Sequence, residues 1–173
     1  MSYKGSYMWN LRQKAGNMTI LTATVDILPI DQDGKVKLAH APHVGGWSCI
    51  GGHVELGDSW SSAALNELRE EGGIVADENN LTPFGVISGP QRIFHYQDGD
   101  TQPFTLCFVI KNWQSEGAQE DTEEITQSGW FEIDEALAMK ITPWCKNILL
   151  GYKRFVETKE FQIIEDVRDN KTG

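Results

Sequence analysis

Three glutamates in the stretch LNELREEGGI, residues 65–74, share one short helical turn. Glu70 follows Glu67 by three positions and Glu71 follows it by four, so in a helix all three side chains project from one arc of about 100°. Like charges at this spacing repel one another by roughly 0.2–0.5 kcal/mol per pair. Carboxylate oxygens on one face are the ligands that hard divalent cations prefer, and a bound cation would remove the repulsion. The spacing therefore predicts a metal site, with a solvated outer face as the alternative.

The residues around this turn resemble the signature of the Nudix hydrolases, G-x5-E-x7-R-E-U-x-E-E-x-G-U, in which U is aliphatic. On this chain the signature runs over residues 52–74, GHVELGDSWSSAALNELREEGGI. The matching positions are Gly52, Glu67, Leu68, Glu70, Glu71, Gly73 and Ile74. Asp58 replaces the first glutamate of the signature, which keeps the charge but shortens the side chain. Asn66 replaces the arginine that helps to hold the glutamates, and its amide brings no charge and no bidentate fork.

The resemblance implies an α+β fold, a Nudix-like α/β/α sandwich with a mixed β-sheet flanked by helices. It also implies a Mg²⁺-dependent hydrolase, with Mn²⁺ as a substitute, that cleaves a pyrophosphate bond in a nucleoside diphosphate derivative. We expect a nucleoside triphosphate as the first candidate substrate and a nucleotide sugar or ADP-ribose as the second. By the same analogy Glu67, Glu70 and Glu71 carry the metal, the Gly51 carbonyl is a further ligand, and Asp58 is an auxiliary ligand.

Asn66 also motivates a competing hypothesis. Without a positive residue beside the glutamates, the general base could be poorly aimed. The chain would then be a catalytically weakened Nudix-fold module that binds or senses a nucleotide.

A general base must take a proton from the attacking water, and removing such a group typically slows a reaction by roughly 10²–10⁴-fold. Within the family this base is either a glutamate of the signature or one from a later loop. Glu67 is therefore our first candidate. Glu124 (or Glu123), in the acidic loop before Trp130, is the second, with a solvated run of charge as the alternative for that loop.

Three residues outside the signature are candidates for binding the substrate. Arg92 precedes a strand rich in aromatic residues and is able to hold a phosphate, although a structural arginine fits the pattern as well. Trp47 and Phe94 are candidates for stacking on a base, with packing in the core as the alternative.

The surrounding pattern predicts the elements that position these residues. Apolar and β-branched runs predict a hairpin of strands at 18–30 and 35–41, joined by a turn at 31–34. A helix follows from Asp58 or Ser59 to about Gly72. Strands are predicted at 82–97, 103–112 and 129–133, and an amphipathic helix at 142–161. We divide the chain into an N-terminal extension at 1–17, a single Nudix-like domain at 18–160 and a polar C-terminal tail at 161–173.

Bulk composition limits the partners of the chain. Its 173 residues suit one domain, and 15 Lys and Arg against 25 Asp and Glu give a net charge of −10, which argues against binding a nucleic-acid polymer. No apolar run approaches the roughly 18 residues that cross a bilayer, and the first residues lack the apolar core of a signal peptide, so we expect a cytoplasmic protein with no membrane partner. The scattered Cys49, Cys107 and Cys145 indicate buried, reduced thiols. For a family of this kind a homodimer formed through the N-terminal segment is also expected.

Overall fold

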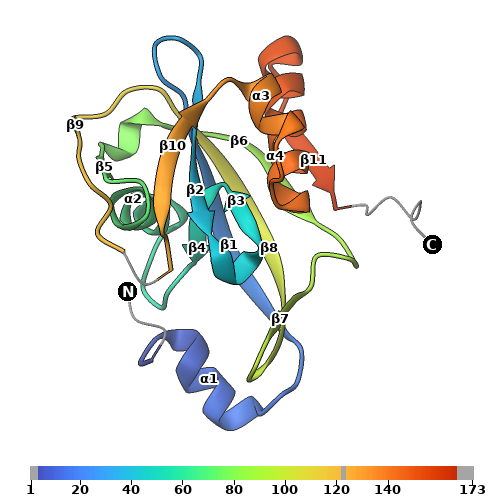
Figure 1. The fold of residues 1–173 in the computed structure, drawn as a ribbon. Helices are drawn as coiled ribbons and strands as arrows, with labels where there is room; N and C mark the ends of the chain where they lie inside the picture. The colour runs from blue at the N-terminus through green and yellow to red at the C-terminus, as the bar shows by residue number, and fades with distance from the viewer. Residues whose placement is uncertain (1–3, 122–123, 167–173) are drawn as a thin grey trace.

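The computed structural model describes residues 4–121 and 124–166, and its centre is a mixed β-sheet (Figure 1). The strands lie in the order β11-β6-β8-β1-β4, and β7 pairs with β8 as a sixth strand. Their bounds are β1 Ile20–Pro29, β4 Ile50–His53, β6 Leu81–Ser88, β7 Phe94–Tyr96, β8 Gly99–Ile110 and β11 Gln162–Glu165. The β1–β8 and β11–β6 pairs are parallel and the other pairs are antiparallel. This mixed sheet confirms the predicted fold class.

A second, smaller sheet has the order β10-β2-β3, formed by Gln127–Phe131, Val36–Ala41 and Gly46–Ser48. The predicted turn at 31–34 is present, but the predicted hairpin is wrong. One bridge, Ile30 to Val36, joins the two strands before they separate. The edges of β1 are already occupied by β4 and β8, so β2 pairs with β10 and β3 instead.

Two helices cover opposite faces of the large sheet: α2, Trp60–Glu70, and α4, Pro143–Thr158. Alternate residues of β8 explain this arrangement, because successive side chains of a strand point to opposite faces. Phe108 and Ile110 join the core beneath α2, whereas Cys107 and Val109 join the core beneath α4. The glutamate-rich segment is thereby fixed against one face of the sheet.

The remaining short elements connect these layers. They are α3 at Ile133–Ala138, the two-stranded pair β5 Ile74–Val75 and β9 Ser115–Glu116, and single 3₁₀ turns at Pro42–Val44 and Glu78–Asn80. Cys49, Cys107 and Cys145 are free and buried, as predicted. None of the helices in the described part of the chain is long and apolar enough to cross a membrane.

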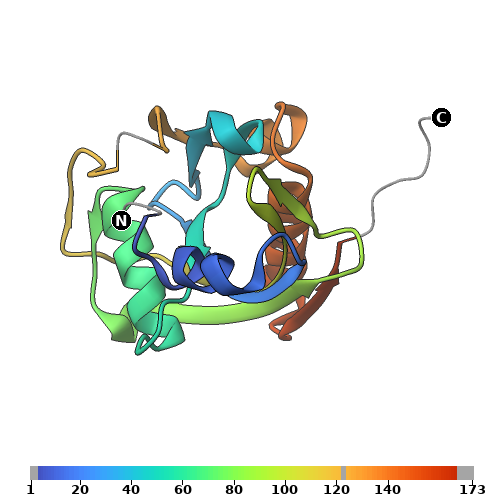
Figure 2. The same ribbon diagram turned by 90° about the horizontal axis from the view of Figure 1, so that it is seen from below.

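Both ends of the chain contribute to the fold. The segment expected to be an N-terminal extension forms α1, Tyr7–Ala15, which lies across the lower end of the molecule in Figure 1 and in front of the sheet in Figure 2. The segment expected to be a polar tail contains β11, which extends the large sheet through β6.

Candidate active site

The site is built where α2 faces the glycine pair of β4. Ser59 caps α2 by accepting from the Ser62 main-chain N–H, and the Ser62 side chain accepts in turn from the Ser59 main-chain N–H. Buried Ala64 and Leu68 pack the helix against the core. This packing directs Glu67 and Glu71 toward β4. The predicted helix is therefore confirmed, and it begins after Ser59.

The glycine pair allows the glutamates to approach the strand closely. A Cβ atom at Gly52 would lie 2.2 Å from Glu67 Oε1, so the carboxylate occupies space that any other residue would fill. The Gly51 N–H donates to Glu71 Oε2 at 2.9 Å. Gly51 and Gly52 thus form one wall of the site and the glutamate arc forms the other.

Burial changes the acidity of two of these carboxyls. Burial and the neighbouring charge of Glu70 raise the pKa of Glu67 to about 8. Burial and the charge of Glu67 raise the pKa of Glu71 well above its ordinary value, and the Gly51 hydrogen bond opposes this only in part. Desolvation and like charge both disfavour the ionised forms, so the site gains from any cation that reaches it.

The acidic loop is held beside the same helix end by main-chain contacts. The Glu70 carbonyl accepts from the N–H groups of Glu120 and Asp121 at 2.9 and 2.8 Å. Arg69 pairs with the side chains of both Glu70 and Glu120. These contacts bring Asp121 and Glu124 to the cavity that the glutamates line. Glu123, the other candidate base, lies outside the described residues.

The donors around this cavity suit a hard divalent cation. A cavity of about 150 Å³ is lined by the glycine pair and by four carboxylates, those of Asp58, Glu67, Glu70 and Glu71. Carboxylate oxygens are the ligands that such cations prefer. In the described part of the chain, no three His, Cys, Asp or Glu side chains are already arranged as a ligand set. Glu71 is turned to the Gly51 N–H and Glu70 to Arg69, so both would exchange these contacts on binding a metal.

A second cavity, of about 130 Å³, is lined by Gly51 and Glu71 and by the buried Arg92. Arg92 Nη2 donates to Thr105 Oγ1 at 2.7 Å and lies 3.2 Å from Asp26 Oδ2. Burial raises the pKa of Asp26 to about 6, although the Arg92 charge lowers it. Arg92 Nε and Nη1 are buried and have no hydrogen-bond partner among the described residues. A buried guanidinium with spare donors beside a cavity indicates a place for an acceptor group.

Aromatic rings surround this guanidinium. The Arg92 Cζ atom lies 5.5 Å from the ring centroid of Phe94 and 6.0 Å from that of Trp144. Trp47 is placed differently: it makes edge-to-face contacts with His40 and Phe131 and does not line either cavity. The structure therefore brings Phe94 to the cleft with Arg92 and places Trp47 outside it.

Sequence reasoning missed three residues of the cleft. His53 Nε2 is buried and has no partner among the described residues, and its ring faces both cavities. Asp26 is the one charged residue of its strand, and His53 directly follows the glycine pair, so both positions could have been noticed in the sequence. Nothing in the sequence pointed to Trp144, because its position in the cleft depends on how α4 packs.

A glycine-rich strand facing an acidic helix, within an α/β/α sandwich, is the arrangement that the sequence signature implied. The family model of the NUDIX domain matches residues 20–151. The chain belongs to the Nudix hydrolase family, whose members hydrolyse pyrophosphate bonds in nucleotide derivatives, and it is a pyrophosphohydrolase of that general class.

Individual relatives agree with this assignment. The chain is 27% identical to the "Uncharacterized Nudix hydrolase YvcI" of Bacillus subtilis (strain 168), over 78% of this chain and 87% of the relative. It is 30% identical to the "Oxidized purine nucleoside triphosphate hydrolase" of Danio rerio, over 76% of this chain and 81% of the relative. The NUDIX domain of Shewanella oneidensis NrtR, solved with ADP ribose, superposes with a TM-score of 0.64 at 18% identity, over 90% and 99% of the two chains. The last similarity shows the fold alone.

The two glycines should respond differently to alanine. At Gly51 a Cβ would lie 2.2 Å from the main-chain oxygen of Val25, so Gly51→Ala must push β4 from β1 and should lower the free energy of unfolding by about 1–3 kcal/mol. At Gly52 the Cβ meets the end of the flexible Glu67 side chain, so Gly52→Ala should stay folded but lose turnover. Thermal melts and steady-state rates of both variants check this. Equal melting temperatures for the pair would contradict it.

The stability of the metal-free protein should fall as pH rises from about 4.5 to about 8. Because Glu67 has a pKa of about 8 in the folded chain and 4.5 ordinarily, the folded state binds more protons in this window, and stability present below pH 4.5 is lost toward pH 8. Glu67 keeps part of its surface in water, so we expect a loss on the order of 2 kcal/mol.

Urea melts in chelator at several pH values measure this dependence. Glu67→Gln, which cannot ionise, should flatten the curve between pH 4.5 and 8. An identical slope in the wild type and in Glu67→Gln would contradict the assignment.

Proposed function

We propose that this chain is a Mg²⁺-dependent hydrolase whose substrate is a nucleoside triphosphate. The observation that carries the proposal is the arc of Glu67, Glu70 and Glu71 pressed against a glycine strand, with two carboxyl pKa values raised by burial and like charge. Bound Mg²⁺ would act as a Lewis acid: it would polarise phosphorus and lower the pKa of a bound water.

The residues have separate roles in this proposal. Glu67, Glu70, Glu71 and the Gly51 carbonyl hold Mg²⁺, with Asp58 as an auxiliary ligand. Glu67 is also the first candidate to take the proton of the attacking water. Glu124 is the second, because its partly exposed carboxylate lines the glutamate cavity and the Arg92 cavity.

Support for a triphosphate comes from the relative named for that activity, at 30% identity. A nucleotide sugar or ADP-ribose is the second candidate. The Arg92 cavity and the cavity under α1 each share lining residues with the glutamate cavity, which supports room for a group beyond the diphosphate.

Arg92 and Phe94 are proposed to bind the substrate in the second cavity, which both residues line. The spare Nε and Nη1 donors of Arg92 suit phosphate oxygens, and the Phe94 ring fixes the plane of the guanidinium. The role of Trp47 as a binding residue remains a prediction; its ring contacts Phe131 edge-to-face.

A panel of nucleoside triphosphates, nucleotide sugars and dinucleotides with Mg²⁺ tests the function. We expect Glu71→Gln to slow turnover by at least roughly 10²-fold, since a metal ligand is lost, and Glu67→Gln by roughly 10²–10⁴-fold. Glu124→Gln compares the two candidate bases. Glu78→Gln, an exposed residue remote from the cavities, is the matched control. Wild-type protein that cleaves nothing, or glutamine variants at 67 and 71 with normal turnover, would overturn the proposal.

Arg92 should affect substrate binding more than the chemical step. Arg92→Met removes the charged donors and should raise KM by roughly 10- to 100-fold, because a hydrogen bond to a charged group contributes about 1.5–3 kcal/mol. Arg92→Lys, which keeps the charge but not the fork, should recover part of the loss. Steady-state kinetics on the best substrate of the panel provide the measurement. An unchanged KM in both folded variants would mean that Arg92 serves only as the partner of Asp26.

A further inference from the structure

We propose that α1, outside the matched Nudix domain, completes a binding cavity for the nucleoside part of the substrate, and that Arg12 is the positioning residue that holds this helix in place. The inference rests on the proposed function for the identity of the ligand. Its geometrical basis is independent, because α1 ends at Ala15 and the family match begins at residue 20.

The cavity under α1 has a volume of about 600 Å³ and shares Glu124 with the glutamate cavity. Met8, Trp9 and Gln13 of α1 line one side, and Tyr96 and Gln97 of the β7–β8 hairpin line the other. Its volume lies in the range of small-molecule sites in proteins. Among the described residues that line this cavity, seven lie in the family domain and four lie in α1.

The cavity borders the proposed metal site, with which it shares three lining residues. Met8 is buried and lines both this cavity and the glutamate cavity. Glu124 and His53 line both as well, and His53 Nε2 is a buried atom with no partner among the described residues. A ligand bound under α1 therefore lies beside the proposed metal site and has an unused hydrogen-bonding atom in the wall of its cavity.

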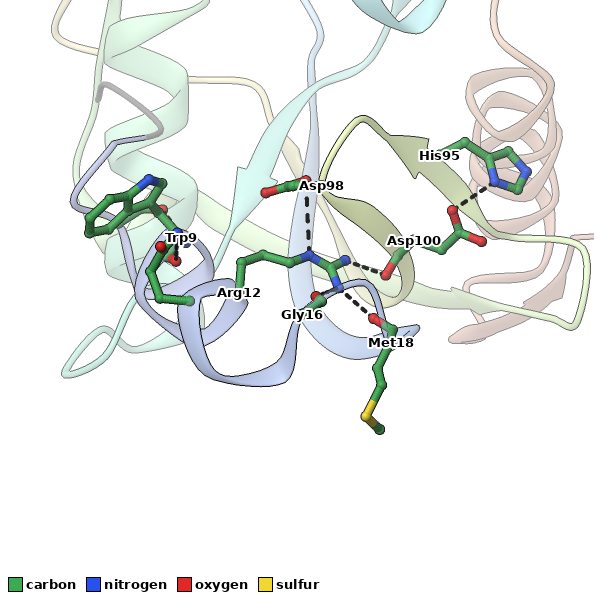
Figure 3. A network of polar contacts seen from close by, with 9 residues as sticks. Trp9, Arg12, Gly16, Met18, His95, Asp98 and Asp100 are labelled. Carbon is green, nitrogen blue, oxygen red and sulfur yellow. Dashed lines mark hydrogen bonds and ion pairs between the residues drawn. The ribbon is translucent and has the colours of Figure 1, made fainter.

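Arg12 fixes α1 to the hairpin, as Figure 3 shows. Its side chain is only 2% exposed. Nη1 donates to the carbonyls of Gly16 and Met18, Nη2 donates to the Asp100 carbonyl, and Nε lies 3.9 Å from Asp98 Oδ1. The donors of this guanidinium are engaged by the fold, which makes Arg12 a positioning residue and not a ligand for phosphate.

The opposite end of α1 is also attached. The Tyr7 N–H donates to Glu55 Oε2 at 2.7 Å, and Glu55 lies just beyond β4 in the signature segment. With both ends held, α1 presents Met8 and Trp9 of its first turn to the cavity.

The chemistry of the walls favours an uncharged group. Met8, Trp9 and Tyr96 provide apolar and aromatic surface, Gln13 and Gln97 provide amides, and the carboxylates of Asp98 and Glu124 repel phosphate. Since the guanidinium of Arg12 is satisfied by the main chain, the cavity suits a base and its ribose better than a phosphate. The phosphates are then left to the metal site and to Arg92.

Calorimetric titration tests this assignment without turnover. The wild type, Arg12→Met and Trp9→Ala are titrated in Mg²⁺ buffer with AMP, GMP, CMP and UMP, and separately with inorganic pyrophosphate, which has no nucleoside. For the monophosphate that binds best, we expect affinity to fall about tenfold in both variants through loss of apolar contact, while pyrophosphate affinity stays within twofold. Arg12→Lys should restore part of the loss.

Lys14→Ala, in the same helix but exposed and away from the cavity, is the matched control and should bind as the wild type does. Circular dichroism verifies folding, and Trp9→Ala keeps the test valid if Arg12→Met unfolds, because Trp9 is only half-buried. Equal losses for monophosphate and pyrophosphate, or no loss in either variant, would overturn the inference. So would a wild type that binds pyrophosphate but no monophosphate, which leaves the hydrolase proposal intact. If the protein binds nucleotides in a way that depends on α1 but cleaves none of the substrates, the hydrolase proposal is wrong and the nucleoside site under α1 is supported.

Discussion

The repulsion among carboxylates pressed between α2 and β4 is the constraint on which the active-site end of this molecule depends. Glu67 and Glu71 share a helical arc, and burial raises the pKa of both. Such an arrangement is stable only if the opposite wall adds no bulk and supplies hydrogen-bond donors. The glycine pair does both, since Gly52 leaves space for Glu67 and the Gly51 N–H donates to Glu71. The electrostatic cost that remains in the metal-free chain is the driving force for taking up a cation.

The cleft contains two buried arginines in different states. Each donor group of Arg12 has a partner in the main chain or in Asp98, so this side chain joins α1 to the hairpin. Arg92 is buried to a similar degree, yet Nε and Nη1 find no partner among the described residues. Leaving buried donors unpaired costs free energy that a ligand can restore. The difference in hydrogen bonding, and not in burial, separates the positioning residue from the proposed binding residue.

What the sequence predicts well is local. The capped helix, its glutamate arc and the glycine pair lie within residues 51–74, where helical spacing alone decides which side chains meet. The hairpin at 18–41 was predicted wrongly because strand pairing depends on distant partners: β1 pairs with β8, and β2 with β10. The pairing of Arg92 with Asp26 spans 66 residues, and that of Arg12 with Asp100 spans 88. No pattern within one segment reports such contacts, so the far walls of the cleft required the fold.

The departure at Asn66 takes on a different meaning in the folded chain. Asn66 is exposed at the rim of the glutamate cavity, whereas Arg69, three positions later, pairs with Glu70 and with Glu120 of the acidic loop. A positive charge therefore still lies beside the glutamates. Arg69 holds Glu70 and, through Glu120, the loop that carries Glu124. Because the Glu70 carbonyl also anchors that loop, the helix end and the loop are fixed together. This second route to an ordered acidic site favours an active hydrolase over a module that has lost its chemistry.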